Sequence, residues 1–421
     1  MIFGNNRSPK LNYRFLGDKP EGKSFTHVEV EEYASGKTNK KPEGIVWFPG
    51  YEFDPTKSND EKSTYRGYFV GEGGRVYANP GSYGESETWD VGSQHPHSIK
   101  EERAFGDYTD IFVELLEARM DIKHKDFESA AKRFGGKLKK YLDDPTVAKN
   151  LAQALKIAIN SVYGLTSARF VNAFRDERNI DNFIAKRGAL FMIDLQLAVE
   201  ALGYTVIHVK TDSIKVHHPD DFIRTFIKRF GECYGYTFEL EAAWDRICLV
   251  NNAVFIGHTK DGWEATGAEF QQPYVFKTLF SHEELEFEDY CETKSVSKGA
   301  IYLDMEDGSE MKFIGRVGQF TPVKHGGTLY RVDNGKNYAV SGTKGYHWME
   351  SEMVKTLGKE DDIDISYYEH MAQEALNHIV VYGNYIDFLD LSKPYEFAGS
   401  SEEAPFMNEP VDSVPLELPF K

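Results

Sequence analysis

The sequence predicts a protein of the α+β class, because helical and strand-like segments dominate different stretches of the chain. Apolar residues recur at helical spacing through residues 108–125 and 145–164, and again over about 179–202. Short strand-like runs with Asp-Gly and Asn-Gly turns instead fill residues 296–346. We therefore expect a core to which both helices and sheets contribute.

The N-terminal half is predicted to lead from turns into helices. Residues 1–80 are rich in turns and show no long helical period, and the strand-like run RVYANPGSY follows. Gly135 and Gly136 separate the first two helical segments, which predicts a helical hairpin.

The third helical segment leads into a β-hairpin whose strands cover 204–208 and 214–217. After the strand-rich region, helical spacing returns near 347–357 and 366–382. No internal repeat is visible.

Size and composition predict a soluble, cytoplasmic protein of two to four subdomains, in the host cytoplasm if the chain is viral. The 421 residues are 41% hydrophobic, no apolar run approaches the length of a membrane span, and the first residues lack a signal-peptide pattern. Three cysteines without CxxC spacing indicate a reducing compartment and argue against zinc or iron-sulfur sites.

The charge is unevenly distributed. A net charge of −18 argues against a nucleic-acid partner, but residues 119–140 hold eight Lys or Arg against three Asp or Glu. Such a basic run either contacts phosphates or is a solvated helix face.

Two polar sites flank a helix with an unusual face. Asp90 lies in TWDVGSQHPHSI, and Asp212 lies in the hairpin turn of VKTDSIKV, where turn chemistry alone would explain it. Between them, a lysine, an amide, an aromatic ring and a glycine share one helix face at positions Lys156, Asn160, Tyr163 and Gly164. Charge for a phosphate, with a ring and a glycine for a base and sugar, suits a nucleotide. An ordinary amphipathic surface is the alternative.

These motifs, in this order, resemble those of family B DNA polymerases. WDVGSQHPHSI resembles the family's DxxSLYPS motif, KIAINSVYG matches KxxxNSxYG, and VKTDSIKV resembles the YGDTDS hairpin. The resemblance implies a right-hand polymerase with palm, fingers and thumb. It implies a palm over 1–104 and 171–250, fingers over 105–170, a thumb over 251–400 with a β insertion at 296–346, and a disordered acidic tail at 401–421.

The resemblance also implies a metal site at the two aspartates. Asp90 and Asp212 would be catalytic, and Asp90, Val91 and Asp212 would hold two Mg²⁺ ions, with Mn²⁺ as a substitute. Lys210 stands where the family has the first hairpin aspartate, so it either binds a primer phosphate or pairs with an acid.

A nucleotide site is implied beside the metals. Arg119 and Lys123 are one helical turn apart and would grip the triphosphate with Lys156. His95 replaces the tyrosine that excludes a 2′ hydroxyl, and imidazole is a smaller gate. The full set is Ser93, His95, Arg119, Lys123, Lys156, Asn160, Tyr163 and Gly164.

DNA contacts are expected at the hairpin and after it. Lys210, Thr211 and Ser213 surround Asp212, and Asn252 and Phe255 lie in ICLVNNAVFIGH, where the family has a lysine-rich segment. Amides can bond phosphates without releasing counterions, so salt would affect this contact less.

The predicted function is template-directed, primer-dependent DNA synthesis from dNTPs on primer-template DNA. Only 89 residues precede Asp90, too few for the family's proofreading exonuclease, which would lie on a separate chain as in some bacteriophage systems. Two alternatives stay open: a non-catalytic polymerase-like DNA-binding subunit, suggested by Lys210, and a primase-like or RNA-synthesising enzyme, suggested by His95.

The C-terminal segment SVPLELPFK suggests one more partner. Leu416, Leu418 and Phe420 alternate, so an extended segment would present all three to one groove. Such ends resemble the tails by which replicative polymerases bind a sliding clamp. A disordered solubilising end is the alternative.

Overall fold

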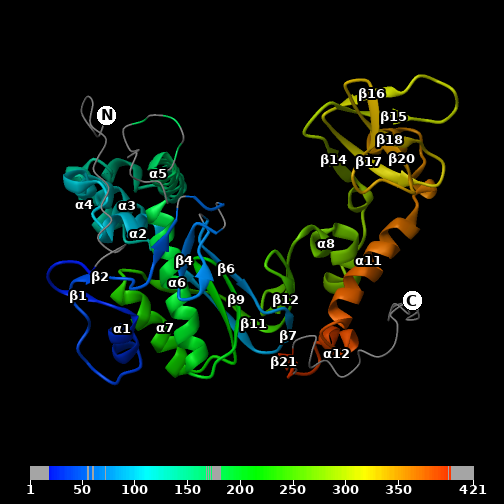
Figure 1. The fold of residues 1–421 in the computed structure, drawn as a ribbon. Helices are drawn as coiled ribbons and strands as arrows, with labels where there is room; N and C mark the ends of the chain where they lie inside the picture. Colours follow the sequence, from blue (N-terminus) through cyan, green and yellow to red (C-terminus); the bar gives the residue numbers. More distant parts are fainter. Residues whose placement is uncertain are drawn as a thin grey trace. The chain divides into compact units, whose positions relative to one another are not determined.

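The computed structural model describes residues 19–396 and 398–399, apart from 55, 59–60, 72, 167, 169, 171 and 173–181. Leu416, Leu418 and Phe420 lie outside the described residues, so the clamp hypothesis stays a prediction. The chain is a mixed α and β protein, as predicted, and it divides into two compact units (Figure 1). Unit 1 comprises Met1–Asn79 and Glu85–Ala243, and unit 2 comprises Pro80–Gly84 and Trp244–Lys421.

Unit 1 is built on an antiparallel sheet. Its neighbouring strands are, in order, β6 (Arg75–Ala78), β9 (Val206–Thr211), β10 (Ser213–His217), β8 (Ser86–Val91) and the first half of β11 (Phe238–Asn251). The hairpin of β9 and β10 confirms the predicted one, and β10 pairs with β8 so that Ser213 lies opposite Asp90. Two motifs far apart in the sequence therefore meet at one end of two adjacent strands.

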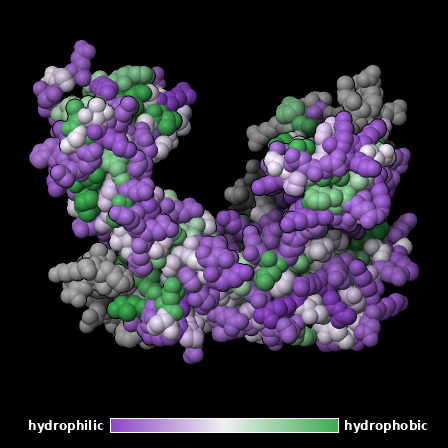
Figure 2. Space-filling view, turned by 180° about the vertical axis from the view of Figure 1, so that it is seen from behind, coloured by the Kyte–Doolittle hydropathy of each residue, from purple (hydrophilic) through white to green (hydrophobic). Residues whose placement is uncertain are grey.

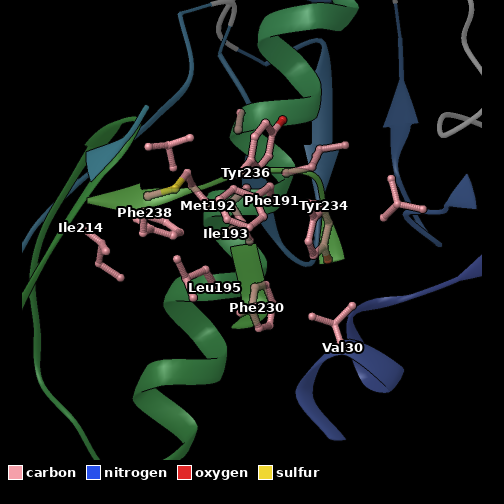
Figure 3. Close-up of a cluster of buried hydrophobic side chains, with 14 of the residues drawn as sticks. Val30, Phe191, Met192, Ile193, Leu195, Ile214, Phe230, Tyr234, Tyr236 and Phe238 are labelled. Atoms are coloured by element: carbon pink, nitrogen blue, oxygen red, sulfur yellow. The ribbon is translucent and has the colours of Figure 1, made fainter. Parts of the chain in front are cut away.

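Helices α6 (Phe183–Ala201), α7 (Asp221–Cys233) and α1 (His27–Ala34) form the core of unit 1 with this sheet. Helix α6 packs on β9 and β6, and α1 packs on α7. Helix α6 is buried along almost its full length, and its buried charged side chains have partners: Lys186 donates to the Val70 carbonyl, and Arg187 pairs with Glu102. Figure 3 shows its Phe191 among Phe230, Tyr234, Tyr236 and Phe238, with ring centroids 4.8 Å from Tyr234 and 4.7 Å from Tyr236.

A helical layer completes unit 1. It contains α2 (Gln94–Glu101), α3 (Thr109–Lys123), α4 (Phe127–Lys132) and α5 (Pro145–Thr166), and α3 and α5 pack together as the predicted helical hairpin (Figure 1). Small and aliphatic side chains, among them Ala118, Ile122, Ala148 and Leu155, fill the contact.

Unit 2 begins with a meander and continues into helices. The second half of β11 pairs with β12 (Val254–Thr259), β12 pairs with β13 (Gly262–Thr266), and β7 (Gly81–Tyr83) also pairs with β11. The helices are α8 (Ala268–Gln271), α9 (Pro273–Phe276), α10 (Ser351–Thr356), α11 (Ile365–Val380) and α12 (Tyr385–Leu389).

The predicted strand-rich region forms two small sheets in unit 2. One contains β14 (Glu292–Ser295), β17 (Val317–Val323) and β20 (His347–Glu350); the other has the order β16 (Lys312–Gly315), β15 (Ala300–Asp304), β18 (Thr328–Asp333) and β19 (Lys336–Ala339). Asn334 and Gly335 both have positive φ, 51° and 72°, which confirms an Asn-Gly hairpin turn between β18 and β19.

Short strands complete the element list: β1 (Ser24–Phe25), β2 (Ile45–Val46), β3 (Glu52–Phe53), β4 (Ser63–Tyr65), β5 (Tyr68–Phe69) and β21 (Ala398–Gly399). No described helix is both long and apolar enough to cross a bilayer. The face in Figure 2 is mostly hydrophilic, with scattered hydrophobic patches.

One local prediction was wrong. Residues 347–350, expected to begin a helix, form β20 because they pair with β17, and only then does α10 start. A strand partner outweighs hydrophobic spacing here. Near the start of the described chain, Glu29 closes a capping box with Thr26 that begins the eight-residue helix α1.

Candidate active site

The candidate site lies in unit 1, where β8 ends and β9 turns into β10. Asp90 is the last but one residue of β8, and Asp212 forms the turn of the hairpin. The Val91 N–H donates to the Asp212 carbonyl at 2.9 Å, so a backbone hydrogen bond joins the two motifs directly. The sequence prediction that Asp90, Val91 and Asp212 act at one place is therefore compatible with the backbone pairing.

The turn is held in a strained but well-supported conformation. Thr211 has a φ of +57°, which is uncommon for a β-branched residue, and the Asp212 N–H donates to the Lys210 carbonyl at 2.7 Å. Buried Gln94, on α2, donates through Nε2 to the Thr211 carbonyl at 3.3 Å. This side chain braces the turn and so helps to fix the direction of Asp212.

Both aspartates resist ionisation. Burial, followed by the charges of Asp212 and Glu241, raises the pKa of Asp90 to about 7, and burial also raises the pKa of Asp212. Carboxylates that repel one another in a partly buried place are a high-energy arrangement, which a divalent cation would relieve. Perturbed carboxylates of this kind gather at functional sites more often than elsewhere.

Two further acids border the pair, and sequence reasoning missed them. Glu239 and Glu241 alternate along β11, so they lie on one face of the strand next to β8. Glu239 accepts hydrogen bonds from Lys123 Nζ at 2.8 Å and interacts with His124 Nε2 at 3.2 Å. Their sequence signal is the alternation of acids in FELE, which places both on one face of a strand.

Buried Lys215 is a third residue that the sequence motifs did not identify. It lies on β10, two residues after Ser213 and opposite Thr88. Burial lowers the pKa of Lys215 to about 8, against the opposing effect of the Glu241 charge. Its cation lies close enough to Glu241 and Asp90 to offset part of the acidic field.

The donor set suits a hard cation that also binds substrate phosphates. Within the described part of the chain, no three His, Cys, Asp or Glu side chains form a ready-made metal cage. Two carboxylates are sufficient for Mg²⁺ where a triphosphate supplies further oxygen ligands. Asp90 and Asp212, with the Val91 backbone, therefore fit a substrate-completed metal site.

A cationic cavity lies between α3 and α5. It has a volume of about 800 Å³, and Arg119, Lys123 and Lys156 line it, together with Lys125 and Lys149. No carboxylate is among its lining residues as far as the chain is described. Arg119 also donates to Ser93 Oγ at 2.6 Å, so the cavity borders the segment that follows Asp90.

The ring pair at the predicted sugar gate is His95 and Tyr163. Their ring centroids are 4.3 Å apart with an interplanar angle of 26°, so the rings stack. Burial lowers the pKa of His95 to about 4, and the imidazole is therefore neutral at pH 7. Asn160 and Gly164 lie on the same helix, α5, and both are exposed; a Cβ at Gly164 would meet open space.

The predicted DNA-contact residues fall into two groups. Lys210, Thr211 and Ser213 lie in the turn of unit 1, where Lys210 is exposed and Ser213 Oγ donates to the Lys210 carbonyl at 3.3 Å. Asn252 is in the β11–β12 turn of unit 2, and Phe255 on β12 packs edge-on against Trp244. Their contacts with DNA stay predictions.

The raised pKa of Asp90 predicts a pH-dependent cost to stability in metal-free protein. An unfolded aspartate has a pKa of about 3.9. The contribution of Asp90 to stability is therefore most favourable below that pH, and it is lost as the pH rises through the folded-state pKa of about 7. We expect Asp90→Asn to raise the free energy of unfolding at pH 8 by about 1 kcal/mol after allowance for solvent screening. The gain should shrink toward pH 5, as thermal unfolding in EDTA would show.

Glu239→Gln is the matched control, because its effect on stability should change with pH in the opposite direction. The hydrogen bond from Lys123 lowers the pKa of Glu239, so the variant should lose stability at pH 8 relative to pH 4. Equal pH profiles for Asp90→Asn and the parent chain would contradict the electrostatic description of the site.

Comparisons with known proteins give likenesses among solved structures. No protein family and no curated protein matches the chain. Among solved structures it is similar to the family B DNA polymerase from the hyperthermophilic archaeon Pyrobaculum calidifontis, at 13% identity and a TM-score of 0.44. The match covers 84% of this chain and 49% of that chain, so this chain spans about half its length. A likeness at this level carries no argument about the site.

Proposed function

We propose that the chain is a nucleotidyltransferase that extends a nucleic-acid primer along a template. One observation carries the proposal: Asp90 and Asp212 are joined through adjacent strands, and the hydrogen bond from Arg119 to Ser93 links them to an acid-free cavity lined by five cations. Carboxylates beside a triphosphate-sized cationic cavity are what phosphoryl transfer requires.

The carboxylates would hold the metals of this reaction. Two bound Mg²⁺ ions supply charge stabilisation to the attacking and leaving oxygens. Asp90 and Asp212 would bind the ions, and the paired strands would fix their positions, since ligands on strands are held more firmly than those on mobile loops. Lys210, exposed at the end of β9, would contact the primer backbone.

The cavity residues would bind and orient the triphosphate. Lys156 on α5 lines the same cavity as Arg119 and Lys123 on α3, so charges from two helices can hold one polyphosphate chain. The Lys123–Glu239 ion pair would open when a phosphate replaces the carboxylate. On this proposal α3 to α5 act as fingers, the sheet of unit 1 with α6 and α7 as palm, and unit 2 as thumb.

DNA is the proposed product, and the stacked His95 and Tyr163 would form the floor under the sugar. A second candidate, RNA synthesis, is favoured by the same observation, because an imidazole is smaller than the family's tyrosine. We expect His95→Tyr to raise the preference for dNTPs over rNTPs by about tenfold or more. Single-nucleotide insertion kinetics with each substrate would measure it, and an unchanged ratio would remove His95 from the gate.

The purified chain is expected not to remove a mismatched primer end. Glu29, one of the acids that precede Asp90, is engaged in the helix cap with Thr26. A primer with a labelled 3′ mismatch should stay intact in Mg²⁺ without dNTPs. If both the parent chain and its Asp212→Asn variant removed the mismatched end, this chain would carry a separate nuclease site.

Primer extension tests the proposed function. The chain should add the nucleotide complementary to each of four templating bases, in the presence of Mg²⁺, to a primer annealed to its template. Binding of primer-template without any extension, with Mg²⁺ or Mn²⁺ and with dNTPs or rNTPs, would favour the non-catalytic subunit instead.

A further inference from the structure

A row of aromatic side chains crosses the four-stranded sheet of unit 2. Tyr302 on β15 lies directly opposite Tyr330 on β18 and is paired with Phe313 on β16. Residues opposite each other in an antiparallel pair point to the same face. The Tyr302 and Phe313 ring centroids are 5.3 Å apart, in an edge-on arrangement. Three neighbouring strands thus present three rings side by side.

This face is open, whereas the other face is packed. Ile301, Leu303 and Leu329 alternate with the tyrosines and are buried in the core of unit 2. Phe313 is 62% exposed, and Tyr302 and Tyr330 are partly exposed. An exposed phenylalanine beside two accessible tyrosines is a poor arrangement for a surface that contacts only water.

Charges are separated along the strands of the same sheet. Lys298 precedes β15, Arg316 follows β16, and Lys336 is the first residue of β19. Antiparallel pairing brings these three positions to one end of the sheet. All three are exposed, and none forms an ion pair within the described part of unit 2. The acid at this end, Asp333, is near Arg331 at 4.0 Å.

The opposite end of the sheet is acidic. The β15–β16 connection carries its carboxylates at Asp304, Glu306, Asp307 and Glu310. The aromatic row therefore has cations on one side and acids on the other, which orients a polyanion with its charges toward the first end.

We propose that Tyr302, Phe313 and Tyr330 form a stacking site for the bases of single-stranded nucleic acid, with Lys298, Arg316 and Lys336 contacting its phosphates. Aromatic rings on an open sheet face bind unpaired bases because every base offers a flat surface to stack upon, and adjacent cations bind the backbone. A duplex hides these surfaces and would gain little. The site does not depend on the proposed polymerase chemistry, since it uses none of its residues.

Oligonucleotide binding by the full chain tests the site. Fluorescence anisotropy with a labelled 12-nucleotide oligo-dT, and with its oligo-rU counterpart to separate DNA from RNA, should show weaker binding by Phe313→Ala and by Tyr330→Ala, about fivefold or more. Phe313→Trp should preserve binding. Tyr338→Ala is the matched control, because Tyr338 lies opposite Arg331, on the other face of the sheet, and is also exposed.

The location and the charges are tested separately from the affinity. Photo-crosslinking of 5-iodouracil-substituted oligonucleotide should label peptides within residues 298–339, whatever else binds in unit 1. Lys298→Glu with Arg316→Glu and Lys336→Glu should reduce the salt dependence of binding, whereas exposed Lys324→Glu should not.

Equal affinities for the parent chain, Phe313→Ala and Tyr330→Ala, or crosslinks confined to other segments, would overturn the proposal. So would a Phe313→Ala variant that loses self-association in sedimentation but keeps its oligonucleotide affinity, because the face would then bind a second copy of the chain. Base stacking would likewise be excluded if Phe313→Ala weakened the binding of a duplex as much as the binding of the single strand.

Discussion

Replacing Asp212 by asparagine should reduce primer extension on the order of a thousandfold or more, while primer-template binding changes by less than about twofold. Asparagine keeps the size and the turn hydrogen bonds but removes the charge that a metal ion requires. Asp90→Asn should have an effect of the same size. Single-turnover extension, with binding measured in parallel by anisotropy, separates chemistry from DNA affinity.

Lys210→Asp is the informative control for this result. It places a second carboxylate two residues before Asp212, but the side chain at position 210 is exposed and is not one of the proposed metal ligands. It should therefore retain far more activity than either asparagine variant. Near-normal extension by Asp212→Asn, or a loss in Lys210→Asp as deep as that in Asp90→Asn, would refute the assignment of the pair.

Lys156→Ala should lower kcat/KM for dNTP incorporation by about a hundredfold, with the KM raised and the kcat lowered together. Lys156 is exposed at the cavity, so the substitution costs little stability, yet it removes a cation placed opposite Arg119 and Lys123. A phosphate contact that strengthens as charge develops on the leaving group serves both binding and chemistry. Pre-steady-state insertion at varied dNTP concentration gives both constants.

Lys156→Arg tests whether charge alone is sufficient. It keeps the cation and should recover much of the rate, although the fork of arginine bonds phosphate differently from the ammonium of lysine. An unchanged dNTP dependence in Lys156→Ala would mean that this lysine only faces solvent, and that the cavity does not hold the triphosphate.

The helices and the hairpin could be predicted because their signals are local. Periodic apolar residues place α3, α5 and α11 within a few residues of their observed bounds, and Asn334-Gly335 identifies its turn. The shared face of Lys156, Asn160 and Tyr163 follows from helix geometry alone once α5 is known.

The contacts that could not be predicted depend on pairing between distant segments. Glu239 and Glu241 join the site only because β11 lies beside β8, and Gln94 braces the turn only because α2 packs near the hairpin. The same holds for the row of Tyr302, Phe313 and Tyr330, which requires the register of three strands. No spacing within one segment carries that information.

Manganese binding tests directly whether Asp90 and Asp212 form a substrate-completed metal site. Anomalous diffraction from crystals grown with Mn²⁺, primer-template and a non-hydrolysable dNTP analogue locates the ions without reference to activity. We expect manganese peaks in contact with the carboxylates of Asp90 and Asp212, and with the triphosphate held against Arg119 and Lys156. Manganese at other carboxylates only, with the triphosphate ordered elsewhere, would contradict it.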